Sequence, residues 1–375
     1  MASSTSNEVE SKTFRERILR PLAVPLLAVF TSLVIGALII IFTAENPAIG
    51  VEKLGKGYWG MFEGAFLKRN GILNTLVVTS PLILTGLAVA IPFHAGLFNI
   101  GAEGQFIMGA FTAVLAGIYL ELPPVIHPIV VMLAGFAGGA LWGLIPGLLR
   151  AYLGAHEVIN TIMMNFIAFA LVSFAVRGPF LDPNTSSVQT YPIQKTAELV
   201  RISGRFHVGI FVTLLVAAVV YYFLYKTTWG FALRTTGQNP DAAKYAGVRP
   251  KHQFVLSLVL AGGLAGLAGS LEVQGLTHVV TTGIRAGYGF DAIGVSLLAL
   301  NNPLAIIPAA FIFGALNIGG DFLQIRAGLS VHIVSILQAF ILLFVAAPAI
   351  VRYLYRLKVP SGVAEGAPVT RGWGG

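Results

Sequence analysis

The stretch that decides the fold spans residues 208–272 and reads VGIFVTLLVAAVVYYFLY (208–225), KTTWGFALRTTGQNPDAAKYAGVRPKH (226–252) and QFVLSLVLAGGLAGLAGSLE (253–272). Two apolar runs flank one cationic segment. Each run approaches the about twenty residues that a helix needs to cross about 30 Å of hydrocarbon. The pattern therefore predicts two membrane helices joined by a loop in water.

The rest of the chain has the same character. Hydrophobic residues make up 56% of it and charged residues 11%, with a mean hydropathy of +0.80; soluble domains carry roughly 25% charged residues. We predict an all-α, polytopic membrane protein with about ten transmembrane helices. The expected spans are residues 21–42, 74–92, 97–120, 125–149, 157–176, 208–225, 253–272, 287–301, 304–322 and 331–351.

Three basic regions predict the orientation. Four Lys or Arg residues precede the first span, five lie in 226–252 against one acid, and four follow the last span. With ten spans these regions fall on one side, which the positive-inside rule assigns to the cytoplasm. We therefore expect a cytoplasmic tail at 1–20, a transmembrane domain at 21–351 and a disordered cytoplasmic tail at 352–375. The basic balance does not indicate nucleic-acid binding, because the charges flank apolar spans.

One short helix is predicted inside the 226–252 loop. Asn239 suits the N-cap, Pro240 the first helical position and Asp241 the positive end of the dipole, while Gly247 can adopt the left-handed conformation that ends a helix. An isolated helix over 240–246 is marginal in water. We expect a partner surface to order it, which suggests coupling to a soluble machine.

Small residues predict where helices touch. One row of small residues at a spacing of four consists of Gly139, Gly143 and Gly147. A second consists of Gly262, Gly266 and Ser270 and lies beside alanines. Such rows let membrane helices approach closely. In addition, the outer segment 51–71 carries aromatic residues at near-helical spacing, which indicates a helix at the membrane interface.

A weak inverted internal repeat is also visible. The segments GLFNIGAEGQFIMGA (96–110) and IRAGYGFDAIGVS (284–296) each place a Gly-rich break and an acidic residue before a new apolar helix. The copies are five spans apart, so they would face opposite ways through the membrane. Inverted repeats with interrupted helices are typical of transporters, whose pathway lies at the repeat interface.

No enzymatic centre is visible in the sequence. It contains no GxxxxGK[ST], HExxH or GxSxG motif, no cysteine, and seven scattered histidines. We therefore expect no catalytic residue, no metal site and no cofactor in this chain.

Polar residues at membrane depth are the candidates for a solute path. Placing a polar group in hydrocarbon costs free energy, so such residues usually face the interior of the helix bundle. On the 157–176 helix they share one stripe, and others cluster at the Gly-rich breaks. Two interpretations stay open: these groups contact solute, or they cap the broken helix ends. The predicted path residues are Phe98, Asn99, Glu103, Gln105, Glu157, Asn160, Thr161, Met164, Asn165 and Asp291.

Three segments carry a resemblance to a known family. The spacing Asp241-Ala242-Ala243-x3-Gly247 resembles the EAA-x3-G motif with which permeases of ABC importers engage their ATPases, with Asp in place of Glu. Together with GLFNIGAEGQ (96–105) and HEVINTIMMN (156–165), it is similar to the nucleoside-importer branch of the permeases that also serve ribose and branched-chain amino acids. The likeness covers roughly 74–350 and is greatest to the longer of two paired permeases.

That resemblance implies a set of partners and roles. These are a second permease, an ATPase subunit that binds ATP and Mg²⁺, and an extracytoplasmic substrate-binding lipoprotein, with a nucleoside or related polar solute as cargo. It also implies a multi-pass protein of the bacterial plasma membrane, with both termini cytoplasmic. The implied ATPase-coupling residues are Asn239, Pro240, Asp241, Ala242, Ala243, Tyr245 and Gly247.

Two other classes of function would require different features. A self-contained, ion-coupled carrier of a polar metabolite would need an ion site at depth and no docking helix. An integral-membrane enzyme acting on lipid-linked substrates would need a convergent acid/base or metal cluster at the interface, and the sequence shows none. The sequence favours half of an ATP-driven import pore.

Overall fold

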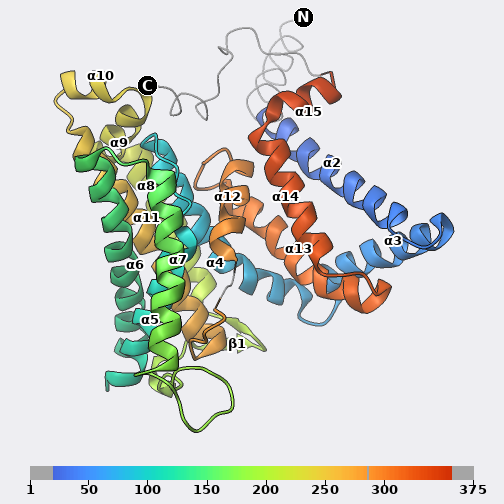
Figure 1. Ribbon diagram of the computed structural model, residues 1–375, viewed down its shortest axis with the longest axis horizontal. Helices are drawn as coiled ribbons and strands as arrows, with labels where there is room; N and C mark the ends of the chain where they lie inside the picture. Colours follow the sequence, from blue (N-terminus) through green and yellow to red (C-terminus); the bar gives the residue numbers. More distant parts are fainter. Residues whose placement is uncertain (1–19, 285–286, 357–375) are drawn as a thin grey trace, which may run out of the picture. The chain divides into compact units, whose positions relative to one another are not determined.

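A computed structural model describes residues 20–284 and 287–356; the expected tails at 1–19 and 357–375 lie outside the described residues. The chain forms two compact units, described separately below. One contains the described residues up to Met61 and from Gly320 onward, and the other contains Phe62–Gly319 (Figure 1).

The larger unit contains most of the helices. They are the π-helix η2 (Glu63–Leu67), α4 (Gly71–His94), α5 (Ala102–Tyr119), α6 (Ile126–Leu153), α7 (Glu157–Arg177), α8 (Gly209–Lys226), α9 (Thr228–Gln238), α10 (Pro240–Tyr245), α11 (Pro250–Glu272), the π-helix η4 (Val273–Thr277), α12 (Tyr288–Leu298) and the first part of α13 (Ile306–Ala327). Between α7 and α8 lie the 3-10 helix η3 (Lys195–Ala197) and a hairpin of β1 (Arg201–Ser203) and β2 (Phe206–His207).

The smaller unit is built on α2 (Arg20–Phe42). Helix α14 (His332–Ala346) and α15 (Pro348–Leu354), which meet at 89°, pack against it through a cluster of Ala28, Phe344 and Val351. Helix α3 (Pro47–Phe62) is the predicted interfacial helix, and the Tyr58 hydroxyl donates to the Leu33 carbonyl of α2 at 2.6 Å. Helix α15 also extends the ordered chain to Leu354, three residues into the segment expected to be a disordered tail.

Each of the ten predicted apolar runs forms a helix. Within the described residues, seven helices are long and apolar enough to span a membrane, or eight if the bent pair α14 and α15 counts as one span. The difference from ten comes mainly from the two interrupted regions: α12 has 11 residues, which covers about 16 Å and cannot cross alone. Residues 97–101, expected inside a span, are non-helical and precede the 18-residue α5.

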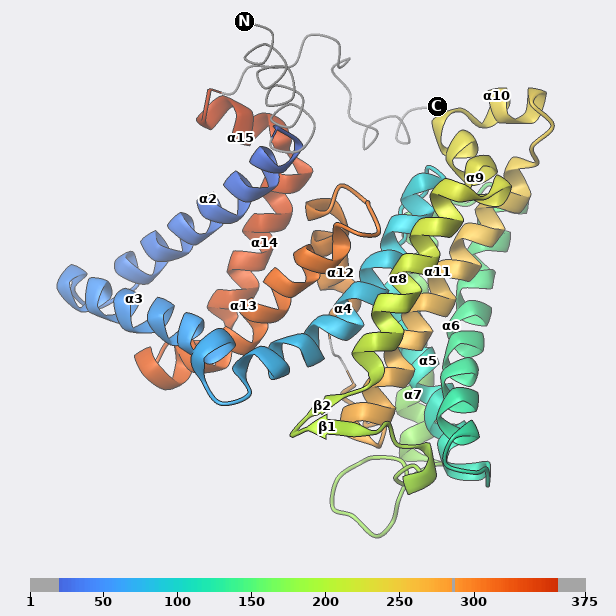
Figure 2. The same ribbon diagram turned by 180° about the vertical axis from the view of Figure 1, so that it is seen from behind.

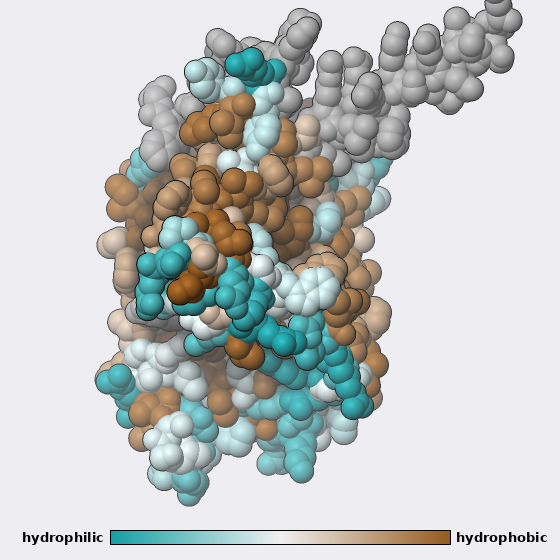
Figure 3. Space-filling view, turned by 90° about the vertical axis from the view of Figure 1, so that its right-hand side faces the viewer, coloured by the Kyte–Doolittle hydropathy of each residue, from teal (hydrophilic) through white to brown (hydrophobic). Residues whose placement is uncertain are grey.

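Large apolar side chains are exposed on many helices, as expected of helices that face lipid. Figure 3 shows hydrophobic side chains over much of one face, with hydrophilic ones gathered across its lower half. On α2, for example, Leu26, Phe30 and Phe42 are exposed. Lipid rather than water is the solvent that suits such a surface.

The two predicted rows of small residues lie on α6 and α11 and meet each other. A Cβ at Gly139 would lie 2.1 Å from the Gly262 carbonyl oxygen, and one at Gly266 would lie 2.2 Å from the Gly135 carbonyl oxygen. The two helices lie side by side in Figures 1 and 2. Since no larger residue fits between these backbones, the row sets the spacing on which the larger unit is built.

The ends of the larger unit differ in character. Because α8 runs from Gly209 to Lys226, the β1–β2 hairpin and the short helices α9 and α10 lie at its opposite ends (Figure 2). In the hairpin, His207 is buried, and its Nδ1 accepts a hydrogen bond from the Gly209 N–H at 3.1 Å. Burial and, to a lesser degree, the neighbouring Arg201 and His278 lower the pKa of His207 from 6.5 to about 4.

We predict that Gly139→Ala lowers the thermal midpoint of the purified protein in detergent. The added methyl overlaps the α11 backbone, and such overpacking costs about 1–3 kcal/mol. Gly55→Ala on α3 is the matched control, because a Cβ there has nothing within 4 Å; this variant should keep the wild-type midpoint or gain slightly from helix propensity. Equal midpoints for Gly139→Ala and wild type would contradict the packing.

A second prediction concerns acidic pH. The folded hairpin keeps His207 neutral, which stabilises the folded state at pH values above the unfolded pKa of 6.5. As the pH falls toward 4, this contribution to the free energy of unfolding, at most about 3 kcal/mol, is lost. The thermal midpoint should therefore drop between about pH 7 and about pH 4. His207→Asn keeps an acceptor for Gly209 but does not titrate, so its drop should be smaller; an identical drop would show that other groups are responsible.

Candidate functional site

The predicted coupling helix is present as α10 (Pro240–Tyr245). Asn239 is its N-cap, and the side-chain oxygen of this residue accepts hydrogen bonds from the Asp241 and Ala242 N–H groups, each at 3.0 Å. Pro240 occupies the first helical turn, where its missing N–H is not needed. Local sequence is therefore sufficient to start this helix.

The end of α10 is capped as predicted. Gly247 has φ +81°, in the left-handed region. Its N–H donates to the Lys244 carbonyl and the Val248 N–H donates to the Ala243 carbonyl, both at 3.0 Å. These two bonds define a Schellman motif, which satisfies carbonyls that a helix end leaves free.

Most of α10 faces outward. Ala243 is fully buried, whereas Asp241, Ala242, Lys244 and Gly247 are exposed and Tyr245 is 96% exposed. Helix α10 packs on α9 at the end of the larger unit (Figure 1). Helix α10 is thus a short helix with one buried residue, Ala243, and an otherwise exposed surface.

Helix α9 was missed by the sequence analysis, which treated 226–252 as a loop with one helix. Thr227 is its N-cap, and the Thr227 hydroxyl accepts from the Gly230 N–H at 3.1 Å. Gly230, Leu233 and Thr236 are buried at a spacing of three. This cap and this spacing were available in the sequence, but the cationic composition concealed them.

The polar stripe of α7 meets the first Gly-rich break. The Thr161 hydroxyl accepts from the Ile100 N–H at 3.3 Å, and the Asn165 side-chain oxygen accepts from the Gly104 N–H at 2.8 Å. The Asn165 amide also donates to the Ile100 carbonyl at 2.9 Å. The side chains of α7 thus satisfy the backbone where α5 begins.

Asn99 completes this arrangement from within the break. The Asn99 side-chain oxygen accepts from the Gly101 N–H at 3.0 Å, and its amide donates to the Gln105 side-chain oxygen at 3.0 Å. We call Asn99, Gln105, Thr161 and Asn165 the polar cluster; all four are buried. Asn99, Thr161 and Asn165 each accept from a backbone N–H at the start of α5, as the capping interpretation expects, whereas the Asn99–Gln105 bond joins two side chains.

Glu103 joins the two Gly-rich breaks. The Glu103 carboxylate accepts from the Gly287 N–H at 3.1 Å and the Gly289 N–H at 2.7 Å. It lies in the first turn of α5 but its partners open α12, so the carboxylate caps the other repeat. A Cβ at Gly289 would lie 2.2 Å from the Glu103 nitrogen, which explains why only glycine fits there.

The remaining predicted path residues are more loosely held. The Asp291 carboxylate accepts from the Asn317 amide at 3.4 Å, and Glu157 lies 3.3 Å from the Arg150 Nε. Met164 is buried beneath Trp142, whose indole donates to the Met164 carbonyl at 3.2 Å. The Phe98 ring packs at a tilt of 56° against that of Phe93, with centroids 5.0 Å apart. The Asn160 Nδ2 has no hydrogen-bond partner in the described part of the chain. Contact of any of these residues with solute stays a prediction.

Sequence reasoning also missed a buried polar residue just beyond the end of α11. Gln274 in η4 is 0% exposed, and neither polar atom of its amide has a hydrogen-bond partner among the described residues. It lies two residues after the long apolar run 253–272. The rule used for 157–176, that a polar residue at depth is a candidate, would have identified it.

Comparison with known proteins places this architecture. Residues 71–346 match the family model described as the permease component of the branched-chain amino acid transport system. The chain belongs to this permease family. The match covers α4 to α14 and includes both Gly-rich breaks and α10. The chain is accordingly a multi-pass permease subunit of an ABC importer.

Individual relatives of this permease differ in their stated cargo. The chain is 36% identical to the guanosine ABC transporter permease protein NupP of Bacillus subtilis, over 89% of its own length and 95% of that protein. It is 32% identical to the nucleoside ABC transporter permease protein NupB of Lactococcus lactis, over 92% and 95%. A glucose ABC transporter permease of Haloferax volcanii is 31% identical over 85% and 86%.

We predict that Asn165→Leu destabilises the permease. The change leaves the buried Gly104 N–H and Ile100 carbonyl without partners, at about 1–3 kcal/mol for each. Asn160→Leu is the control on the same helix, because the Asn160 Nδ2 has no partner to lose. The thermal midpoint in detergent should fall for Asn165→Leu alone. A stable Asn165→Leu protein that also transports normally would remove Asn165 from both roles.

Proposed function

We propose that this permease forms half of the translocation pore of an ATP-driven nucleoside importer, and that α10 couples it to a separate ATPase. The observation that carries the proposal is the geometry of α10. This helix is capped at both ends, and only Ala243 is buried, so its remaining surface is exposed and available to bind a partner. A helix held this way transmits a pull without unravelling.

The partners follow from that role. A second, related permease completes the pore, and an extracytoplasmic lipoprotein delivers solute to its outer mouth. ATP and Mg²⁺ bind to the ATPase, and this chain supplies no catalytic group. Nucleotide-driven closure of the ATPase would move α10 and shift the pore between outward- and inward-open states.

The orientation proposed here places α10 and both termini in the cytoplasm of a bacterium, with the protein in its inner membrane. Five Lys and Arg residues in 226–252 support this, since basic residues in short loops stay inside. The β1–β2 hairpin, at the opposite end of α8, then faces outward, where the lipoprotein would dock.

A nucleoside is favoured as cargo by two relatives, NupP and NupB, although the glucose permease shows that the fold accepts other cargo. Asn160, Phe98 and Asp291 are only partly buried and offer an amide, a ring and a carboxylate to such a solute.

The experiment that tests the function is reconstitution in liposomes. The permease, its partner permease, the ATPase and the lipoprotein should together take up radiolabelled guanosine when ATP is supplied, and excess glucose or leucine should not compete. Uptake by this chain alone under an ion gradient would instead favour the ion-coupled carrier. ATP-dependent uptake that glucose abolishes would refute the cargo but keep the mechanism.

We predict that Gly247→Val abolishes ATP-dependent uptake without preventing insertion. A Cβ at Gly247 has nothing within 4 Å, so the only penalty is a β-branched residue at positive φ, of order 1–3 kcal/mol. Gly247→Asn is the matched control, because Asn tolerates this conformation, and should retain most of the uptake. Wild-type transport by Gly247→Val would exclude α10 as the coupling element.

Single cysteines test the orientation, since the natural chain has none. In intact cells, Ser187→Cys should react with a membrane-impermeant maleimide, while Gln238→Cys should react only after permeabilisation. The two residues lie on opposite sides of α8 in the chain, so one labels when the other does not. The reverse pattern would invert the proposed topology.

A further inference from the structure

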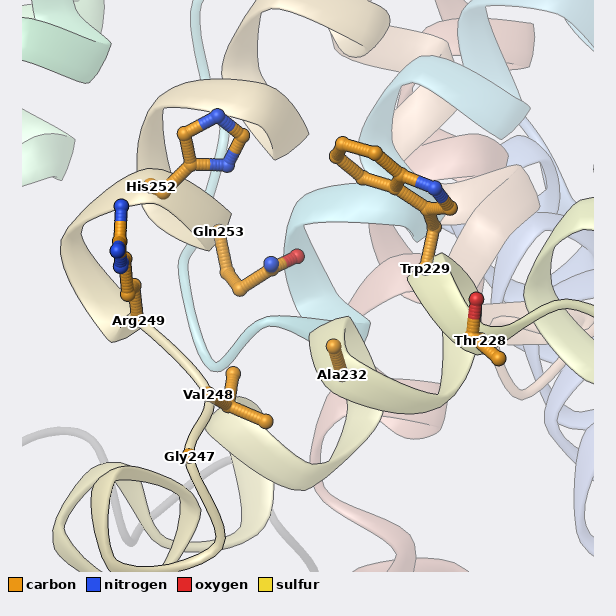
Figure 4. A pocket seen from close by; sticks show the side chains of 8 residues that line it. All are labelled: Thr228, Trp229, Ala232, Gly247, Val248, Arg249, His252 and Gln253. Carbon is orange, nitrogen blue, oxygen red and sulfur yellow. The ribbon is translucent and has the colours of Figure 1, made fainter.

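A hollow of about 360 Å³ lies beside the coupling helix. Its walls come from α9, from the link between α10 and α11, and from the first turn of α11 (Figure 4). The residues that line it are Thr228, Trp229, Ala232, Gly247, Val248, Arg249, His252 and Gln253. None of them is a predicted path residue, and only Gly247 was assigned to coupling.

One wall of the hollow is polar and unsatisfied. Gln253 is 6% exposed, and its side-chain oxygen has no hydrogen-bond partner within 20–284 and 287–356. In Figure 4 the amide points across the hollow toward Trp229. A buried acceptor without a donor is costly, so whatever enters the hollow gains by donating to it.

The opposite wall and the rim have complementary properties. Trp229 is 53% exposed, and its ring lies 5.9 Å from that of His252. Val248 and Ala232 add apolar surface, and Arg249 is exposed at the start of α11. An occupant therefore needs an apolar or planar body, a donor at its tip and negative charge nearby.

The hollow is continuous with α10. Gly247 and Val248 line it and also donate the two hydrogen bonds that close the helix. A group seated in the hollow therefore touches the backbone that fixes the end of α10. A protein that binds α10 would therefore also reach the hollow.

We propose that the hollow is a socket for the ATPase: a loop of that subunit inserts a side chain with a hydrogen-bond donor at its tip, such as a tyrosine or an asparagine, and carries carboxylates beside it. The proposal rests on the proposed function, since it supposes that an ATPase binds α10. The carboxylates pair with Arg249 and with the surplus of cations in 226–252, where five Lys and Arg residues face one Asp.

The socket makes the contact two-sided. The ATPase would hold α10 from outside, on the face that bears Tyr245, and from behind, through the hollow. Two-sided contact lets a rigid helix be pushed as well as pulled, because displacement in either direction meets a bound surface. The hollow would thus increase the affinity for the ATPase and also let the ATPase move α10 back to its starting position.

The test fills the socket. Purified permease pairs in nanodiscs are titrated with the ATPase subunit, for wild type, Ala232→Phe and the control Ala155→Phe. Ala155 lies in the link between α6 and α7 and is not among the residues of the hollow. Ala232→Phe should weaken binding at least about tenfold, the equivalent of 1.4 kcal/mol, and Ala155→Phe should bind like wild type.

Two further variants separate the contributions. Gln253→Leu removes the acceptor and should weaken binding by the same factor at low and high salt. Arg249→Glu should weaken it strongly at low salt and less at high salt, because ions screen an exposed pair. Wild-type affinity for Ala232→Phe, or equal weakening by Ala155→Phe, would overturn the socket.

A labelling measurement covers the case in which Ala232→Phe does not fold. Maleimide should label Ala232→Cys in the permease alone. Saturating ATPase should slow that labelling at least about tenfold, because the inserted loop shields the thiol. Ala155→Cys should label equally fast with and without ATPase. Unchanged labelling of Ala232→Cys with ATPase bound contradicts the socket, whereas failure of wild-type permease to bind any ATPase contradicts the proposed function.

Discussion

The start of α5 depends on one constraint: backbone N–H groups that lie away from water must be paired within the protein. Helix α5 begins inside the bundle, so its first amides cannot turn to solvent. Thr161 and Asn165 of α7 and Asn99 of the break accept these bonds. An interrupted helix is possible here only because another helix supplies the caps.

The same constraint ties the two repeats together. Glu103 accepts from the opening amides of α12, so the carboxylate that starts one interrupted helix completes the other. In neither break are the backbone N–H groups at the helix start paired only with groups of that break. Moving α5 relative to α12 would therefore expose amides or a carboxylate, which makes this junction a natural place for two discrete arrangements rather than a continuous range.

The end of the larger unit that carries α9 and α10 contacts this region through its backbone. A Cβ at Gly237, near the end of α9, would lie 2.2 Å from the His94 carbonyl oxygen and 2.8 Å from the Gly96 nitrogen. Gly96 opens the break that leads to Asn99 and the polar cluster. An unbroken series of packed elements thus connects α10, through α9, to the start of α5.

The sequence by itself determined whatever depends on neighbours in the chain. Apolar runs of sufficient length predicted the long helices, the spacing of Gly139, Gly143 and Gly147 predicted a face of close helix contact, and Asn239 and Gly247 predicted both ends of α10. Each of these features is encoded within a few residues. Local hydrogen bonds and periodicity are visible without knowing the fold.

Only the tertiary structure decided which distant groups meet. The sequence suggested that Glu103 caps a helix, but the helix proved to be α12, whose amides are 184 and 186 residues away. The stripe on α7 was evident, yet its partners in 99–104 were not, and the hollow beside α10 exists because α9 folds back against the start of α11. Long-range partners are selected by packing geometry, which no local pattern specifies.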